Sequence, residues 1–184
     1  MSFAARKRYT YADFLRFPDD GNRHEILDGQ WIMTPPPTTD HQRIIMNLIE
    51  IMSAHIRRRK LGLLLASPVG VVLGQTRVVQ PDLLFVAKSR QSIVRRDAVH
   101  GAPDLLIEVL SPSTASLDRG RKLKTYEDSG VHEYWIVDRD ARTVEVHGFG
   151  RSPRLRVLQT GQAFESDVLL GLAVRVTEVF RGLK

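Results

Sequence analysis

The stretch Asp104-Leu105-Leu106-Ile107-Glu108-Val109-Leu110, residues 104–110, is a nearly continuous apolar run with one acid inside it. Such runs are typical of strands that are covered on both faces of a sheet. Because side chains alternate along a strand, Glu108 shares a face with Leu106 and Leu110, and its carboxylate is expected to be partly buried. A buried carboxylate without a partner is costly, so we expect a basic side chain or a metal ion beside it.

The segments on either side of this strand alternate between strand and helix patterns. Asp28-Gly29 is the dipeptide that best fits a type I′ turn, and it separates two short β patterns, which indicates a hairpin. Apolar residues recur at helical spacing from His41 to Ile56, and Gly62 is the expected stop of that helix. Together these patterns predict a mixed α/β domain in which helices flank a sheet. The expected helices cover residues 10–15, 41–60 and 117–129, and the expected strands cover residues 23–27, 30–34, 63–66, 69–73, 78–86, 104–110, 134–137, 143–147, 155–158 and 172–176.

Length and composition are those of one ordinary globular domain. The 184 residues include 42% hydrophobic and 26% charged side chains, which excludes wholesale disorder and fibrous repeats. We expect a single domain over residues 1–184, with a short N-terminal helical arm over about residues 1–20. The absence of cysteine excludes disulfides, thiolate zinc sites and cysteine nucleophiles. No apolar stretch approaches the roughly 20 residues of a membrane helix, and residues 1–8 lead into no apolar signal segment, so a cytoplasmic location is expected.

The formal charge of +6 at pH 7 favours partners with phosphate backbones or acidic surfaces. The basic side chains gather in two places. The run over residues 57–60 fits the exposed end of a helix, where cations complement the helix dipole. A denser cluster lies within residues 119–124.

A second acid, Asp82, follows Pro81 at the mouth of another apolar strand. If this strand is a neighbour of the strand that carries Glu108, the two carboxylates converge and form an oxygen-ligand site for magnesium or manganese. Lys122 and Tyr126 are one helical turn apart on the helix after Glu108, so both are expected to share a face and reach back over the strand.

Two carboxylates and a lysine are the groups that metal-assisted hydrolysis of a phosphodiester requires. The acids hold a divalent ion that polarises the phosphate, and the ammonium group orients the attacking water or stabilises the developing charge. An acid inside a strand is also common in an ordinary salt bridge. A paired basic side chain therefore remains the alternative explanation of Asp82 and Glu108.

Four motifs along the chain resemble those of the Uma-two family of putative restriction endonucleases, which belongs to the PD-(D/E)xK nuclease superfamily. The similarity extends from about Tyr11 to Phe180 and includes the early segment 25–29 and His41. An ordered series of this kind is specific, whereas the Pro-Asp pair alone would be weak. The motifs are Val79-Gln80-Pro81-Asp82, Gly101 to Thr114, Lys122 to Tyr126, and Gly130 to Asp138.

The resemblance implies a restriction-endonuclease-like fold, with a mixed central β-sheet flanked by α-helices. It implies that Asp82 is the acid of the PD motif and Glu108 the acid of the (D/E)xK motif, and that Glu25 extends the metal shell. Leu110 stands where the superfamily has its lysine, and Lys122 matches the helix lysine that takes over this role in the family. A homodimer that acts on DNA is also plausible on this resemblance.

Two further residues are expected near the site as auxiliary contacts. His41 opens the long helix, where it could meet the acids. Tyr126 follows Lys122 and is a candidate for stacking on a base, whereas Trp135, beside an apolar strand, is expected in the core.

The sequence favours a divalent-metal-dependent nuclease that acts on DNA with Mg²⁺ or Mn²⁺ and uses Asp82, Glu108 and Lys122 as its catalytic residues. The alternative is a catalytically inactive nucleic-acid-binding protein that retains the nuclease fold, and it would bind DNA equally well with a chelator present. A third hypothesis is a structural or regulatory partner protein whose acids are neutralised by Lys122, which predicts neither metal binding nor DNA binding.

Overall fold

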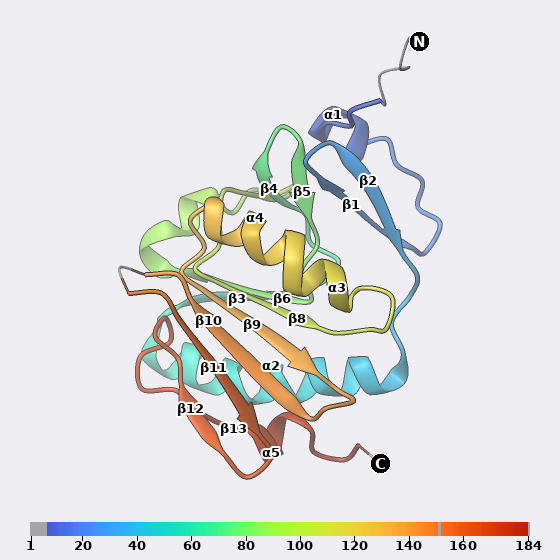
Figure 1. Ribbon diagram of the computed structural model, residues 1–184. Coiled ribbons are helices and arrows are strands. Elements are labelled where there is room, and N and C mark those ends of the chain that lie inside the picture. Colours follow the sequence, from blue (N-terminus) through green and yellow to red (C-terminus); the bar gives the residue numbers. More distant parts are fainter. Residues whose placement is uncertain (1–6, 151, 184) are drawn as a thin grey trace.

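A six-stranded sheet carries the apolar strand that contains Glu108 and lies between helices on both faces (Figure 1). The computed structural model describes residues 7–150 and 152–183. β8 and β9 pair in parallel, whereas the other neighbours pair antiparallel, so the sheet is mixed as predicted. In spatial order its strands are β11 (Arg154–Gln159), β10 (Thr143–Gly148), β9 (Glu133–Asp138), β8 (Leu105–Val109), β6 (Leu83–Ala87) and β3 (Gly62–Ala66).

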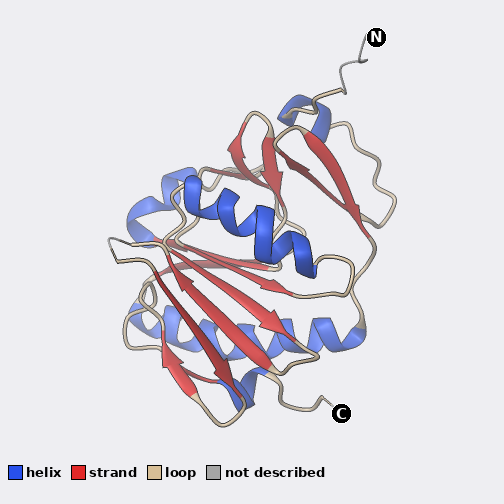
Figure 2. Cartoon of the chain, viewed as in Figure 1, coloured by secondary structure: helices blue, strands red, loops and turns tan. Residues whose placement is uncertain are grey.

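One long helix covers one face of this sheet, and a helical segment in three parts covers the other (Figure 2). Along β8, Leu105 and Ile107 pack with the long helix, and Leu106 packs with the three-part segment. Both faces of β8 are therefore buried, as its apolar run predicts. The long helix is α2 (Thr39–Arg59), and the parts of the other segment are α3 (Ala115–Leu117), the π-helix η2 (Asp118–Lys122) and α4 (Leu123–Asp128).

A five-stranded sheet in the order β2-β1-β5-β4-β7 packs beside the first sheet. Its hairpin has the predicted type I′ turn, because Asp28 has a φ of 51° and Gly29 a φ of 82°. Leu27 and Val79 of this sheet share a buried cluster with Leu106, so one apolar core joins the two sheets. Its strands are β1 (Arg23–Leu27), β2 (Gln30–Thr34), β4 (Val71–Gly74), β5 (Arg77–Val79) and β7 (Val99–His100).

The predicted strand 78–86 is wrong as a single element. The chain leaves the five-stranded sheet after β5 and enters the six-stranded sheet at β6. Pro81 has no N–H to donate to a strand partner, so regular pairing is interrupted there. The N–H of Gln80 donates to Glu25 Oε1 at 2.8 Å instead. The interruption leaves Asp82 at the junction of the two sheets.

The role predicted for Gly62 as the stop of the long helix is wrong, although the helix ends at Arg59, one residue before its predicted end at residue 60. Lys60 adopts the left-handed conformation at the helix end, with a φ of 54°, and Gly62 is the first residue of β3. Gly62 is required for space, because an added Cβ would lie 2.1 Å from the carbonyl oxygen of Val86 and 2.9 Å from the ring of Phe85. The basic run 57–60 is exposed, as predicted.

Gly62→Ala is expected to lower the free energy of unfolding by about 1–3 kcal/mol, because β3 must move away from β6 to admit the methyl group. Urea unfolding measures this change. Gly74→Ala is the control, since Gly74 is also a strand glycine but has nothing within 4 Å of an added Cβ. It is expected to change the free energy by less than about 0.5 kcal/mol. Equal losses in the two variants would contradict the steric argument.

The remaining predicted elements are present with small differences in their bounds, whereas the strands Val99–His100 and Ala163–Glu165 and the helix Val176–Val179 were not predicted. The expected helix 117–129 corresponds to the segment from α3 to α4, with the π-helix in its middle. Thr10 and Asp13 form the predicted capping box at the N-terminal helix, while residues 1–6 of the expected arm lie outside the described residues. Among the helices of the described residues, none has the length and apolar character to cross a membrane. The other elements are α1 (Tyr11–Phe14), η1 (Lys88–Ile93), the antiparallel pair β12 (Ala163–Glu165) and β13 (Ala173–Arg175), and α5 (Val176–Val179).

Candidate active site

Asp82 and Glu108 lie side by side because β6 and β8 are neighbouring antiparallel strands. Leu83 is opposite Ile107, which places the preceding Asp82 beside Glu108. The N–H of Val109 donates to Asp82 Oδ2 at 2.7 Å. Both acids are buried, with exposed fractions of 1% for Asp82 and 2% for Glu108. The structure thus brings together the two carboxylates that the sequence marks at apolar strands.

Lys122 contacts three acids at once. Its Nζ lies 2.9 Å from Glu108 Oε1 and 2.9 Å from Glu25 Oε2. Asp118 Oδ1 lies 3.4 Å from the same nitrogen. Tyr126, one turn further along the helix, donates its hydroxyl to Glu108 Oε1 at 2.9 Å. Lys122 and Tyr126 therefore share a face and reach Glu108, in agreement with their i, i+4 spacing.

Asp118 is a site residue that the sequence analysis missed. Asp118 and Lys122 are the two ends of η2, and both are buried, whereas Arg119, Gly120 and Arg121 between them are exposed. Single π-helical turns occur frequently at functional sites, because the extra residue re-aims the side chains at their ends. The available sequence signal is an acid four residues before a lysine on one helix.

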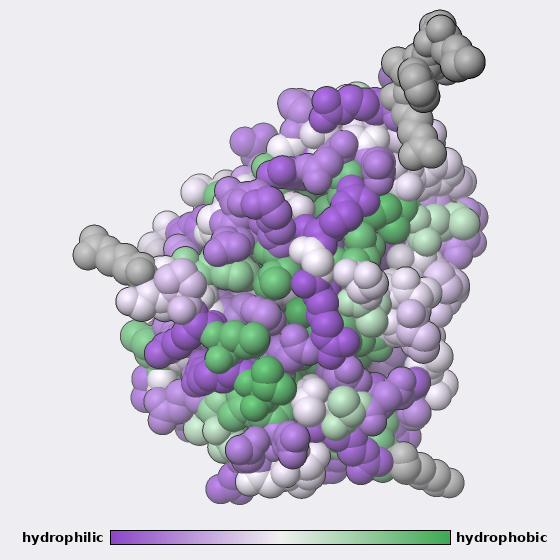
Figure 3. Space-filling model, in the orientation of Figure 1, coloured by the Kyte–Doolittle hydropathy of each residue, from purple (hydrophilic) through white to green (hydrophobic). Residues whose placement is uncertain are grey.

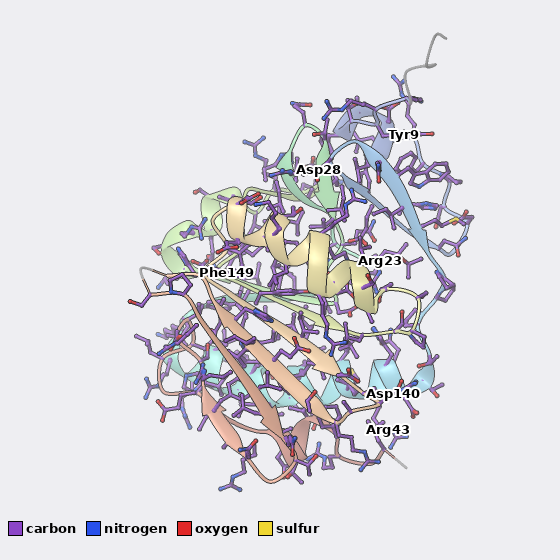
Figure 4. All side chains as sticks on the ribbon, viewed as in Figure 1. Tyr9, Arg23, Asp28, Arg43, Asp140 and Phe149 are labelled. Atoms are coloured by element: carbon purple, nitrogen blue, oxygen red, sulfur yellow. The ribbon has the colours of Figure 1, made fainter. Side chains whose placement is uncertain are left out.

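Arg23 is a second missed residue, and it bridges the two central acids. Its Nη2 lies 2.6 Å from Asp82 Oδ1, and its Nη1 lies 3.6 Å from Glu108 Oε2. Nη1 also donates to the carbonyl oxygen of Gln80 at 2.9 Å. Figure 4 shows Arg23 between the five-stranded sheet and the start of the three-part helical segment. Its sequence signal is its place two residues before Glu25, because alternate residues of β1 point to one face.

His41 reaches the site from the first turn of α2. Its Nε2 lies 3.1 Å from Asp82 Oδ2, and its backbone N–H donates to the Thr38 hydroxyl at the helix N-cap at 3.3 Å. Nδ1 of the same ring is buried and has no hydrogen-bond partner among the described residues. The structure therefore brings the expected auxiliary residue His41 to the site through Asp82.

The aromatic side chains near the site are part of the core. Tyr126 is 0% exposed and packs edge to face with Tyr134 at 4.9 Å. The expectation that Tyr126 stacks on a base is therefore wrong, because its buried ring has no open face; its contact is the hydroxyl on Glu108. Trp135 is also buried and packs against Phe164, which confirms its assignment to the core.

Leu110, which the family resemblance places at the position of the superfamily lysine, has its side chain in the apolar core on the α4 side of the sheet. Residue 110 therefore supplies no ammonium group, and the ammonium group that contacts Glu108 is that of Lys122. The helix thus supplies the positive charge that the strand does not.

Burial controls the protonation of Glu108. It raises the pKa of Glu108 to about 8; the charge of Lys122 acts in the opposite direction, and the charges of Asp118, Asp82 and Glu25 add to the rise. Burial likewise raises the pKa of Asp118. A neutral Glu108 carboxyl is therefore favoured near neutral pH in the protein without a bound metal ion.

Asp82 differs from Glu108 although both are buried. Burial raises the pKa of Asp82, but the hydrogen bond from His41 and the charge of Arg23 outweigh it, so the net pKa lies below the usual range. Burial lowers the pKa of Lys122, but the charges of Glu108 and its other acidic neighbours raise it above its ordinary value. Asp82 is therefore ionised and Lys122 protonated at neutral pH.

The charged side chains face a cavity of about 210 Å³. Among the groups joined in ion pairs around Glu108, and with all acids ionised, the four carboxylates exceed the two cations by two negative charges. That excess equals the charge of one divalent cation. The carboxylates are those of Glu25, Asp82, Glu108 and Asp118, and the cations paired with them are Arg23 and Lys122; a third cation that borders the cavity, Arg139, pairs with Asp140 instead.

The donor set fits a hard divalent cation. Carboxylate oxygens are the ligands that Mg²⁺ and Mn²⁺ prefer, and the excess negative charge is of the right size. Within the described residues, no three acidic or histidine side chains are already grouped around one point. The reason lies in the ion pairs, since Arg23 lies between Asp82 and Glu108, and Lys122 lies between Glu108 and Glu25.

A mixed sheet between helices, with one acid in a strand, a second acid just before the neighbouring strand and a lysine against the first acid, defines a protein of the restriction-endonuclease-like class. Residues 11–177 match the sequence model of the Uma2 family, whose description is "Putative restriction endonuclease". The chain belongs to this family, and the predicted resemblance is confirmed.

Two relatives show how far the similarity extends. The crystal structure of a putative nuclease belonging to DUF820 from Anabaena variabilis superimposes with a TM-score of 0.78 at 19% identity, over 93% of this chain and 97% of that chain. An uncharacterized protein of Synechocystis sp. is 23% identical over 147 residues, which are 79% of this chain and 83% of that protein. The predicted fold class is confirmed over nearly the whole chain.

Proposed function

We propose that the protein is a divalent-metal-dependent endonuclease that hydrolyses phosphodiester bonds in DNA. The observation that carries the proposal is the pair of buried carboxylates, Asp82 and Glu108, which come from neighbouring strands and face one cavity together with Lys122. The description of the family as restriction endonucleases supports both the nuclease activity and DNA as the substrate.

Asp82 and Glu108 would hold Mg²⁺ or Mn²⁺ through their carboxylate oxygens. The ion would supply polarisation of the scissile phosphate and a more acidic attacking water. Glu25 is the third candidate ligand. Because its oxygens contact Lys122 and the N–H of Gln80, we expect it to act mainly by fixing the position of Lys122.

Lys122 would stabilise the negative charge that develops on the phosphate and orient the attacking water. Its ammonium group is held by Glu25 and Asp118 and is shielded from solvent, so little reorganisation is needed during the reaction. His41 and Tyr126 would hold the carboxylates of Asp82 and Glu108 in their orientations through one contact each.

The surface beside the helical segment supports a polyanionic substrate. Arg121 and Lys124 are exposed on η2 and α4, and the net charge of the chain is +6. Hydrophilic side chains are interspersed with smaller hydrophobic areas over the face that carries α4 (Figure 3). Exposed cations of this kind attract the phosphate backbone without regard to base sequence.

A cleavage assay on supercoiled and linear DNA with Mg²⁺, Mn²⁺ or a chelator tests the proposal. Cleavage with either metal ion and none with the chelator is the expected result. DNA binding that is equally strong with the chelator, without cleavage under any condition, would instead favour the inactive binding protein.

The homodimer and the cytoplasmic location stay predictions. Light scattering tests the homodimer, because a monomer has the chain mass of 20.9 kDa.

Asp82→Asn and Glu108→Gln are each expected to weaken Mn²⁺ binding by more than about tenfold, because the loss of a ligand should cost at least as much as the loss of a group that orients one. Isothermal calorimetry measures the affinity. Asp140→Asn is the control, since Asp140 is an exposed acid in the turn between β9 and β10. Unchanged affinity in both site variants would remove the proposed ion from this cavity.

A further inference from the structure

Arg23 lies at the oxygens that the proposed metal ion would need. Asp82 Oδ2 is held by His41 at 3.1 Å and by a backbone N–H at 2.7 Å. The other oxygen of Asp82, Oδ1, lies 2.6 Å from Arg23. Glu108 Oε1 is held by Lys122, and its other oxygen, Oε2, lies 3.6 Å from Arg23. A guanidinium group therefore occupies the position between the two carboxylates.

Arg23 is also less enclosed than the other charged groups of the site. Its side chain is 16% exposed, compared with 1% for Asp82 and 2% for Lys122. Arg23 borders both the cavity of about 210 Å³ and a second cavity of about 490 Å³, which Gln42 and Met46 also line. The guanidinium group thus has a second, larger space beside it, in addition to the acids' cavity of about 210 Å³. Lys122, held by three acids, has no comparable freedom.

We propose that Arg23 occupies the cation position of the metal-free protein and exchanges with the divalent ion, after which its guanidinium group turns to the larger cavity and binds a phosphate of the DNA strand. This inference rests on the proposed metal-dependent function. A guanidinium group suits both states, because it pairs with carboxylates and with phosphates through the same planar set of N–H donors.

The exchange couples metal binding to DNA binding. Arg23 competes with the metal ion for Asp82 and Glu108, and once displaced it becomes available to the substrate. By thermodynamic reciprocity, DNA that binds the displaced guanidinium group also strengthens metal binding. If the displaced state makes up about 10% of the metal-free protein, the competition lowers the apparent metal affinity about tenfold.

The test is Mn²⁺ calorimetry, without DNA, on the full chain and on Arg23→Met and Arg23→Gln. Both variants are expected to bind Mn²⁺ about tenfold more tightly than the parent, because the competing cation is gone. Arg77→Met is the matched control, since Arg77 pairs with Asp28 at 2.7 Å on the same sheet but does not border either cavity. Thermal unfolding identifies folded variants, and Arg23→Gln retains a hydrogen-bonding amide if the methionine variant does not fold.

Equal or weaker Mn²⁺ binding in the folded Arg23 variants, with a parent that binds Mn²⁺, overturns the exchange and leaves the proposed function standing. Binding by the variants alone supports the exchange. Absence of binding in the parent and in every variant overturns the metal site and the exchange together. The cleavage assay with chelator then decides separately whether the protein is a nuclease.

A second measurement tests the contact with DNA. Ca²⁺ serves as a divalent ion that we expect to bind without supporting cleavage, and the anisotropy of a labelled duplex reports DNA affinity. Ca²⁺ is expected to strengthen DNA binding by the parent several-fold more than by Arg23→Met. An equal Ca²⁺ effect in both proteins would overturn the phosphate contact of Arg23.

Discussion

Lys122→Ala is expected to slow DNA cleavage by about 10²- to 10³-fold, the usual cost of removing one preorganised group that stabilises developing charge. Lys122 supplies the ammonium group that contacts Glu108, and Leu110, which the family resemblance places at the position of the superfamily lysine, is apolar and buried. Single-turnover cleavage with saturating Mn²⁺ measures the loss. Lys124→Ala is the control, because Lys124 is 76% exposed, pairs with Asp128 and lies away from the cavity.

The same variant is expected to lose about 3–5 kcal/mol of folding stability, because the acids around Lys122 lose their buried partner. The double variant Lys122→Met, Glu108→Gln removes one cation and one acid together, and it is expected to recover part of that stability without recovering cleavage. Circular dichroism and urea unfolding separate the two effects. Cleavage by folded Lys122→Ala at the rate of the parent would show that the ammonium group is assigned to the wrong residue.

Glu108→Gln is expected to abolish cleavage and, in the presence of a chelator at pH 8, to stabilise the fold. Glutamine keeps an oxygen that can accept from Lys122 and Tyr126, and it avoids the burial of a charge. Cleavage is lost because a neutral amide is a much weaker ligand for Mg²⁺ or Mn²⁺ than a carboxylate. The group that the proposed reaction needs is thus one that the metal-free fold holds at a cost.

The stabilisation by Glu108→Gln should depend on pH in one direction. Burial raises the pKa of Glu108 to about 8 from its ordinary value of 4.5. Between these values the unfolded chain is ionised at this residue while the folded chain keeps the proton, so the stability of the parent falls as pH rises, by up to about 1.4 kcal/mol per pH unit. Below about pH 4.5 and above about pH 8, Glu108 does not change the dependence of stability on pH.

Urea unfolding with a chelator present, from about pH 5 to about pH 9, measures how the free energy of unfolding changes with pH. Glu108→Gln should lack the part of this pH dependence that Glu108 contributes. Glu165→Gln is the control, and because Glu165 is exposed in β12, it should keep the pH dependence of the parent. Parallel curves for the parent and Glu108→Gln would mean that Glu108 is ionised in the fold throughout, and the inference that its carboxyl is neutral near neutral pH would be wrong.

Local patterns predicted the elements around the site and the direction of several side chains. The alternation in residues 104–110 predicted the buried face of Glu108, and the helical spacing predicted the shared face of Lys122 and Tyr126. Both rules depend only on the geometry of one strand or one helix, so they need no knowledge of distant contacts. For the same reason the Asp28-Gly29 turn was predicted correctly.

The errors arose where one continuous pattern was divided by tertiary structure. Residues 78–86 have a uniform β pattern, but they belong to two sheets, because the interruption at Pro81 allows the chain to leave one sheet and enter the other. Gly62 was wrongly predicted to stop the long helix, because a glycine can be required for close packing as well as for a left-handed turn. Only the position of Val86 across the strand pair reveals which of these applies.

The sequence by itself determined the family, the alternating strands and the three residues Asp82, Glu108 and Lys122 as candidates, since these depend on local order along the chain. Tertiary structure alone decided that Arg23 bridges the acids, because it is 59 residues from Asp82 and reaches it only through the placement of β1 beside β5. It also decided the protonation of Glu108, because burial and neighbouring charges are properties of the packed fold and not of any segment.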